Sequence, residues 1–200
     1  MYKMTASLYN AFLNAHYGDF PKVLRKEEIE ITPQIQYGWD FENLVYSLLG
    51  LENLREDNPL AGDEKELATA QKMVDTLSNL YVIKSDFIDG EFIVDDLKLS
   101  FLLRGCPDLL TPNMIIDIKT TGKYYVGKYF PSIQHLIYAY LLNINNFVYL
   151  INNNGNIYTE TYNYSREQIK QLLTDRLKEF VLFLKSNNYF EEYKTIWKIN

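Results

Sequence analysis

The spacing of apolar residues predicts helices in the first part of the chain. In residues 34–50, apolar side chains fall at i, i+3, i+4 and i+7, which is typical of a helix with one buried face: Phe41, Leu44, Val45 and Leu48. Gly50 follows them as a stop signal. Residues 5–16 read as a shorter helix, and residues 63–80 read as a solvated helix led by acidic side chains.

Beyond residue 80 the pattern changes to that of strands. The segments that read as strands are 81–94, 97–110, 114–119, 147–152 and 157–164. A helix opened by Pro131 and Ser132 lies among them, and Ser165 caps a long final helix. This order predicts an α/β or α+β fold in which helices flank a central mixed, mostly antiparallel sheet.

Composition narrows the class of protein. The chain has 200 residues, of which 47% are hydrophobic, so one domain with a sizeable core is expected over 1–200. No apolar run is long enough to cross a membrane, and the N-terminus lacks a signal-peptide pattern, so we expect a cytoplasmic protein with no membrane contact. A single cysteine, Cys106, excludes an iron–sulfur cluster or an all-cysteine zinc site within one chain.

The charge of the chain is uneven. The net charge is −6, which argues against a general polyanion binder. Residues 97–128, however, carry five basic residues against two acids. A local basic segment of this kind can attract phosphate groups even on an acidic protein.

The segment "RGCPDLLTPNMIIDIKTT", residues 104–121, places charges among apolar strand residues. Asp117 and Lys119 are two apart and share one face of a strand. An even-length loop centred on Pro112–Asn113 would set Asp108 directly opposite Asp117, whereas an odd loop would break that register. Two opposed carboxylates repel unless a cation lies between them, and oxygen-only ligands suit Mg²⁺ or Mn²⁺. The alternative is that Lys119 pairs with one aspartate while the other lies at a solvated strand end.

Three further features accompany these charges. Gly105 lies three residues before Asp108, an apolar strand leads directly into Asp117, and Gln134 and Tyr138 are one helical turn apart on one face. Alternatively, Gln134 and Tyr138 could simply form a hydrogen bond with each other at a helix surface. His135 and His16 are expected to be ordinary, partly buried histidines.

These residues resemble the PD-(D/E)XK nuclease superfamily. "PD" at 107–108 and "DIK" at 117–119 match its signature, and "GCPD", "DIK" and "QHLIY" together are similar to the GxxD, DxK and QxxxY motifs of the RecB-like and phage-exonuclease branch. Gly38 and Glu42 in "GWDFE" match the acid that this branch carries on an upstream helix. The resemblance covers about residues 38–150 and implies a restriction-endonuclease-like core. In that reading the catalytic core spans about 81–152, after N-terminal helices at 1–80 and before a C-terminal strand and helix at 153–200.

The resemblance implies a role for each matched residue. Asp108 and Asp117 would hold Mg²⁺ or Mn²⁺, with the backbone carbonyl of Ile118 and the Glu42 carboxylate completing the site. Lys119 would orient and help deprotonate the attacking water. Gln134 and Tyr138 would position the acids and the strand that is cleaved. Glu42 could equally be one acid on the polar face of a helix.

The loop after the matched lysine mixes cations with aromatic residues: Lys123, Tyr124, Tyr125, Lys128 and Tyr129. This mixture suits contacts to a nucleic-acid backbone together with stacking on bases, although a solvated loop anchored by tyrosines fits it as well. Lys123, Lys128 and the upstream Arg104 are the expected substrate contacts.

We therefore expect a metal-dependent DNA nuclease, most readily an exonuclease of phage or recombination and repair type. A restriction-like endonuclease is an alternative. Such an enzyme would need a separate module to recognise its DNA sequence, and 200 residues leave little room for one. A nuclease fold that has lost catalysis and binds nucleic acid or protein is another. DNA is the expected partner, and self-association or a recombination partner protein stays open.

Overall fold

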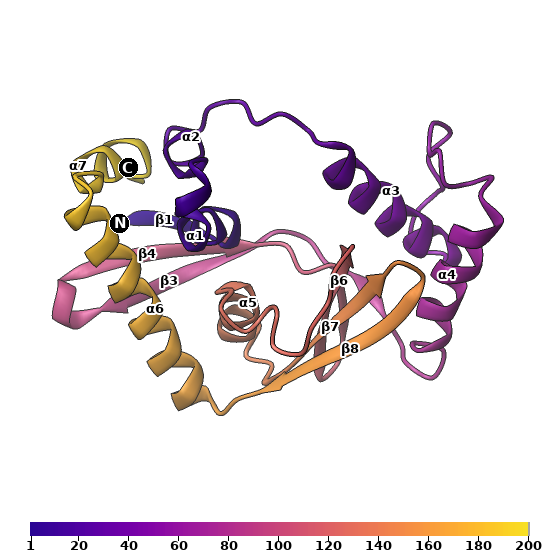
Figure 1. The fold of residues 1–200 in the computed structure, drawn as a ribbon. Helices are drawn as coiled ribbons and strands as arrows, with labels where there is room; N and C mark the ends of the chain where they lie inside the picture. Colours follow the sequence, from indigo (N-terminus) through magenta and orange to yellow (C-terminus); the bar gives the residue numbers. More distant parts are fainter. Residues whose placement is uncertain (200) are drawn as a thin grey trace.

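The computed structural model describes residues 1–199, apart from the side chain of Tyr17. The strands are β1 (Tyr2–Thr5), β2 (Ile83–Lys84), β3 (Ile88–Val94), β4 (Leu99–Gly105), β5 (Leu109–Thr111), β6 (Met114–Thr121), β7 (Asn146–Asn153) and β8 (Asn156–Asn163). The α-helices are α1 (Ala6–Leu13), α2 (Phe20–Leu24), α3 (Pro33–Leu48), α4 (Glu64–Asp75), α5 (Gln134–Leu142), α6 (Arg166–Ser186) and α7 (Phe190–Ile196). Short 3₁₀ turns occur at Ala15–Tyr17 and Asp95–Leu97. Figure 1 shows their arrangement.

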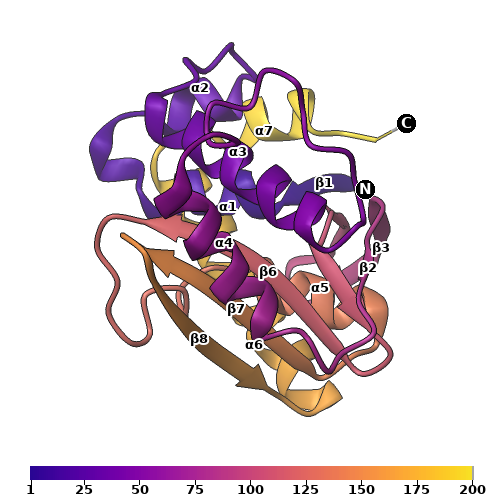
Figure 2. The ribbon, with the colours of Figure 1, turned by 90° about the vertical axis from the view of Figure 1, so that its right-hand side faces the viewer.

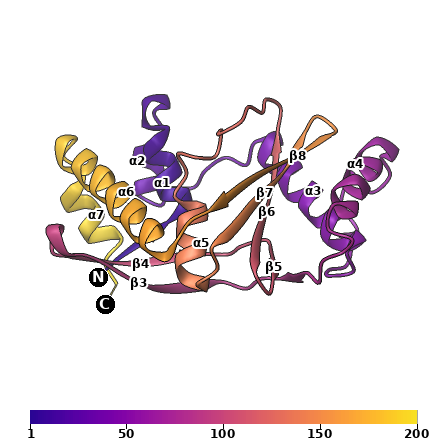
Figure 3. The same cartoon turned by 90° about the horizontal axis from the view of Figure 1, so that it is seen from below.

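The central sheet has five strands in the order β2-β5-β6-β7-β8. Only β6 and β7 are parallel, and the other neighbours are antiparallel. Figures 2 and 3 show α3 and α4 on one face of this sheet and α5 and α6 on the other. The predicted α+β class, with a mixed and mostly antiparallel central sheet flanked by helices, is therefore confirmed.

A second sheet of three strands, β1-β4-β3, was not expected from the sequence. The strand predicted over 97–110 is in fact two strands in different sheets, because β4 ends at Gly105 and β5 begins at Leu109. Pro107, which lacks a backbone N–H, lies in this break and cannot donate to a strand ladder. The strand predicted over 81–94 is likewise interrupted and contributes only β2 and β3.

The helix ends follow local capping chemistry. Thr32 accepts a bond from the Ile35 N–H and precedes Pro33, which fixes the start of α3. Asp63 caps α4, which ends at Asp75 and is shorter than the predicted 63–80. Ser165 caps α6, as the sequence indicated, and it forms a capping box with Gln168.

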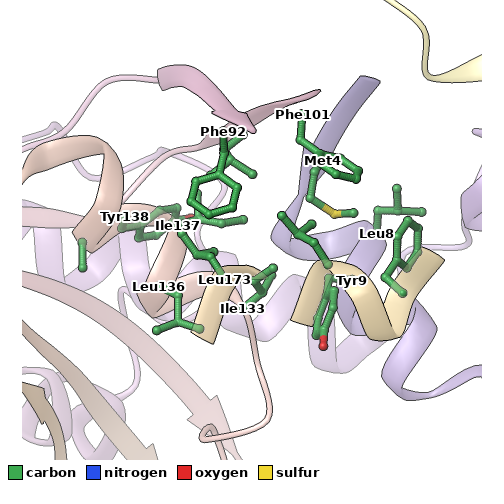
Figure 4. Close-up of a cluster of buried hydrophobic side chains, with 14 of the residues drawn as sticks. Met4, Leu8, Tyr9, Phe92, Phe101, Ile133, Leu136, Ile137, Tyr138 and Leu173 are labelled. Carbon is green, nitrogen blue, oxygen red and sulfur yellow. The ribbon is translucent and has the colours of Figure 1, made fainter. Parts of the chain in front are cut away.

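The core is divided by the central sheet. One cluster of buried side chains lies beneath α3 and α4 and includes Phe41, Met73 and Ile116. The larger cluster lies where α5 and α6 meet the three-stranded sheet, and Figure 4 shows residues of it such as Phe92 and Ile137. Both clusters include residues of β6, so this strand is buried on both of its faces. Among the described residues, no helix is both long and apolar enough to cross a bilayer.

Candidate active site

The β5–β6 hairpin has the even register that the sequence predicted. Leu110 pairs with Ile115 and Thr111 pairs with Met114 across the turn at Pro112–Asn113. Asp108 lies one position beyond this ladder, immediately before β5. Its Oδ2 accepts a hydrogen bond of 2.6 Å from the Ile118 N–H. The hairpin therefore brings the Asp108 carboxylate to the part of β6 that carries Asp117.

Asp117 and Lys119 form an ion pair inside the sheet. The Asp117 side chain is 1% exposed and that of Lys119 is 26% exposed. Gln134 Nε2 donates to Asp117 Oδ1 at 2.9 Å. Asp117 Oδ2 is buried, and its contact with the Lys119 ammonium lacks hydrogen-bond geometry. Lys119 thus pairs with one aspartate, as the alternative reading allowed, but Asp108 is partly buried and hydrogen-bonded rather than placed at a solvated strand end.

Gln134 and Tyr138 join α5 to the same hairpin. Gln134 Nε2 donates to the Tyr138 hydroxyl at 3.1 Å, and that hydroxyl donates to the Cys106 carbonyl at 3.2 Å. A Cβ on Gly105 would lie 2.1 Å from Tyr138 Cε1, so only glycine leaves room for the ring. One helix therefore fixes both the Asp117 carboxylate and the backbone that leads into Asp108.

Glu42 approaches from α3. This helix lies close to β6, since a Cβ on Gly38 would be 3.3 Å from Thr120 Oγ1. Burial and then the charge of Asp117 raise the pKa of Glu42, against a hydrogen bond with Tyr46 and the charge of Lys119. Glu42 is therefore within electrostatic reach of the hairpin. Within residues 1–199, however, no three His, Cys, Asp or Glu side chains are grouped closely enough to hold a metal ion by themselves.

The hairpin carboxylates carry unfavourable charge energy. Burial, followed by the charges of Asp117 and Glu42, raises the pKa of Asp108 well above its usual range. Burial raises the pKa of Asp117, and the Lys119 ammonium opposes that shift. Burial lowers the pKa of Lys119, but the negative charges of Asp117 and Asp108 raise it by more. The pKa of Lys119 is therefore raised above its usual value. A cation between the carboxylates would relieve this repulsion.

The donor set fits a hard divalent cation. Two carboxylates and the Ile118 carbonyl are all oxygen ligands, and the buried Asp117 Oδ2 has no hydrogen-bond donor. Glu42 would have to move closer, or act through water, to join them. No metal is needed to explain the Lys119–Asp117 pair, which neutralises part of the charge in its absence.

The basic and aromatic loop divides into anchors and exposed residues. Lys128 donates to the Lys123 carbonyl at 2.7 Å and contacts Thr121, so its ammonium closes the loop. Glu160, which is buried, accepts bonds from the Tyr124 hydroxyl at 3.0 Å and the Gly127 N–H at 3.2 Å. The Tyr129 ring lies 4.7 Å from that of Tyr149.

Lys123 and Tyr125 in the same loop face solvent, with Tyr125 60% exposed. Arg104 lies elsewhere, on β4, with its guanidinium 5.1 Å over the Phe87 ring. It lines a cavity of about 490 Å³ together with Lys3 and Tyr138. Lys3 was not identified from the sequence, because only the pairing of β1 with β4 brings it beside Arg104.

The two histidines differ from the partly buried state expected for both. His135 is 2% exposed and stacks on Tyr162 with ring centroids 4.3 Å apart. Burial, and then the charge of Arg176, lowers the pKa of His135 to about 3. His16 lies at the surface. Neither contributes to the hairpin site.

Comparison with known proteins gives no family assignment. No family model matches the chain, and no curated protein matches its sequence. Among solved structures, an alkaline exonuclease, LHK-Exo from Laribacter hongkongensis, aligns over 96% of this chain and 93% of its own with 14% identity and a TM-score of 0.45. The protein SSO0001 aligns over 88% of this chain and 75% of its own with 14% identity and a TM-score of 0.42. Likeness at this level is distant, so the function has to be argued from the site itself.

Proposed function

We propose that this chain is a metal-dependent nuclease that hydrolyses phosphodiester bonds in DNA, of the PD-(D/E)XK type. The observation that carries the proposal is the pair of carboxylates, Asp108 and Asp117, held on one hairpin beside the Lys119 ammonium. A structural ion pair needs one acid and one base, whereas a second, partly buried acid with a raised pKa costs stability and favours a functional explanation.

In this proposal Asp108, Asp117 and the Ile118 carbonyl hold Mg²⁺ or Mn²⁺, and Glu42 completes the set. The bound ion would supply Lewis-acid stabilisation of the phosphate and a more acidic bound water. The Lys119 ammonium, which pairs with Asp117, would orient the attacking water and stabilise charge on the phosphate oxygens.

Gln134 and Tyr138 act on the acids rather than on the phosphate. The Gln134 amide holds Asp117 Oδ1, so Oδ2, which pairs with the Lys119 ammonium, is the oxygen that would be shared with an ion. The Tyr138 hydroxyl fixes the Cys106 carbonyl two residues before Asp108. Both contacts keep the carboxylates in place when the ion exchanges.

We further infer that the enzyme is an exonuclease. The exposed Lys123 and Tyr125, on the loop that directly follows β6, support a grip on a single strand through phosphate contact and base stacking. The anchoring of this loop by Glu160 and Lys128 supports its role as a preformed surface.

The distinguishing experiment compares linear and closed circular duplex DNA of the same sequence in Mg²⁺. An exonuclease shortens the linear form progressively and leaves the closed circle intact. Linear fragments of discrete size from the circle would instead support the endonuclease alternative. Binding of both forms without any cleavage would support the inactive binding module.

A further inference from the structure

We propose that a cavity on the α3 side of the acids binds one unpaired nucleotide of the DNA strand, with its base stacked on Trp39 and its phosphate beside Lys84. The inference rests on the proposed nuclease function and names a subsite for its substrate. The cavity has a volume of about 330 Å³, which is within the range of small-ligand sites. Its lining residues are Trp39, Glu42, Asn43, Tyr46, Glu52, Arg55 and Lys84.

Helix α3 places the cavity next to the proposed metal site. Trp39, Glu42, Asn43 and Tyr46 fall at i, i+3, i+4 and i+7, so they share one face of the helix. Glu42, whose pKa is raised by burial and by the charge of Asp117, forms part of the cavity wall. A nucleotide held here would therefore lie beside the phosphate that the hairpin acts on.

Trp39 is exposed in a way that packing does not explain. Its side chain is 49% exposed, whereas the other tryptophan of the chain, Trp197, is 7% exposed and donates its Nε1–H to the Leu24 carbonyl at 2.7 Å. An indole face open to solvent offers a stacking surface for any base, and such stacking is largely independent of sequence.

The two cations of the cavity are held in place before any ligand arrives. The Lys84 ammonium lies 4.7 Å over the Tyr46 ring and pairs with Glu52. Arg55 pairs with Asp40, whose side chain is 3% exposed. Side chains that are already ordered lose less conformational freedom on binding, which favours their use as ligand contacts.

The charge balance indicates which contact dominates. Lys84 and Arg55 are opposed by Glu42 and Glu52 within the same wall. Without a bound metal ion the cavity therefore has little net attraction for phosphate, and stacking on Trp39 supplies most of the affinity. A base stacked within duplex DNA cannot present its face to the indole, so the subsite selects an unpaired nucleotide.

The test uses the full chain in EDTA, so that binding is measured without cleavage. A short single-stranded oligonucleotide, labelled for anisotropy, is titrated with wild type, Trp39→Phe, Trp39→Ala and Leu182→Ala. Leu182 is 66% exposed on α6 and serves as the matched surface control. We expect Trp39→Ala to weaken binding about tenfold, Trp39→Phe to retain most of the affinity, and Leu182→Ala to have no effect.

Intrinsic fluorescence provides a second readout that a structural role would not move. The single-stranded oligonucleotide should quench wild-type tryptophan emission, a fully abasic strand of the same length should not, and Trp39→Phe should show no quenching. Equal affinity of wild type and Trp39→Ala, or equal quenching by the abasic strand, would overturn the subsite.

Cleavage of linear DNA in Mg²⁺, measured in parallel, separates this inference from the proposed function. Cleavage without Trp39-dependent binding would overturn the subsite and leave the nuclease proposal standing. Trp39-dependent quenching without any cleavage would support the subsite and overturn the nuclease proposal.

Discussion

At the scale of single residues, contact distances explain why glycine precedes the first aspartate. The Tyr138 ring occupies the space that a side chain at position 105 would need, and the Tyr138 hydroxyl donates a hydrogen bond to the Cys106 carbonyl. The sequence could indicate Gly105, Gln134 and Tyr138 only through their resemblance to known motifs. It could not show that the three act together, because the contact depends on how α5 lies against β4.

We expect Gly105→Ala to destabilise the protein by about 1–3 kcal/mol, since overpacking at a rigid site forces side chains or backbone to shift. Gly62→Ala is the matched control, because nothing lies within 4 Å of a Cβ at that position. Urea unfolding of both variants measures the difference. Equal stability of the two variants would show that the β4–α5 contact is looser than described.

His135 makes a separate residue-scale prediction for pH. Its pKa in the folded state is about 3, below the value of about 6.5 for an unfolded histidine, so the unfolded chain binds the extra proton first. Stability from this group is therefore present above about pH 6.5 and falls by up to about 1.4 kcal/mol per pH unit as the pH drops towards 3.

The measurement is the free energy of urea unfolding between pH 7 and pH 5 for wild type and His135→Gln. The fall in stability should be smaller in His135→Gln than in wild type. Parallel slopes for the two proteins would mean that the pKa of His135 is not lowered by folding.

At the scale of elements, the hairpin was predictable and the sheets around it were not. The register of β5 and β6 follows from a short turn centred on Pro112–Asn113 between two apolar segments, which are local features. The four-residue strand β1 has no such signal, and its place depends on pairing with β4 far along the chain. Pro107 could have indicated the break between β4 and β5, because proline cannot donate to a strand ladder. The apolar residues on both sides of it nevertheless led to the prediction of one strand over 97–110.

The loop between β6 and α5 supplies the element-scale prediction. Its shape depends on Glu160, which accepts bonds from Tyr124 and Gly127 and contacts the Tyr162 hydroxyl. We expect Glu160→Ala to loosen the loop and to accelerate tryptic cleavage after Lys123 and Lys128. Glu191→Ala, at a side chain 80% exposed on α7, is the control. Unchanged cleavage at the loop would show that Lys128 alone holds it.

At the scale of the whole molecule, the sheet separates two clusters and holds the proposed chemistry between them. On the α5 side, Gln134 positions Asp117. On the α3 side, Glu42 lies within electrostatic reach of the hairpin, and Trp39 lines the same cavity as Glu42. The net charge of −6 gave no sign of the nucleic-acid substrate that we propose, since the cations assigned to it are few and local. The sequence thus predicted the fold class and the register of the hairpin. The second sheet, Lys3 and the Trp39 cavity depend on long-range packing.

The central claim is that Asp117 belongs to a metal site that hydrolyses DNA. It is tested most directly by the rate of linear DNA degradation in Mg²⁺, Mn²⁺ or EDTA, for wild type, the isosteric Asp117→Asn and Asp175→Asn on the exposed side of α6. We predict degradation by wild type and Asp175→Asn only with a divalent ion. We predict a loss of at least about a hundredfold for Asp117→Asn, since removing even a residue that supports a metal ligand typically costs about 10- to 100-fold. Degradation by Asp117→Asn at the wild-type rate, or by wild type in EDTA, would contradict the account.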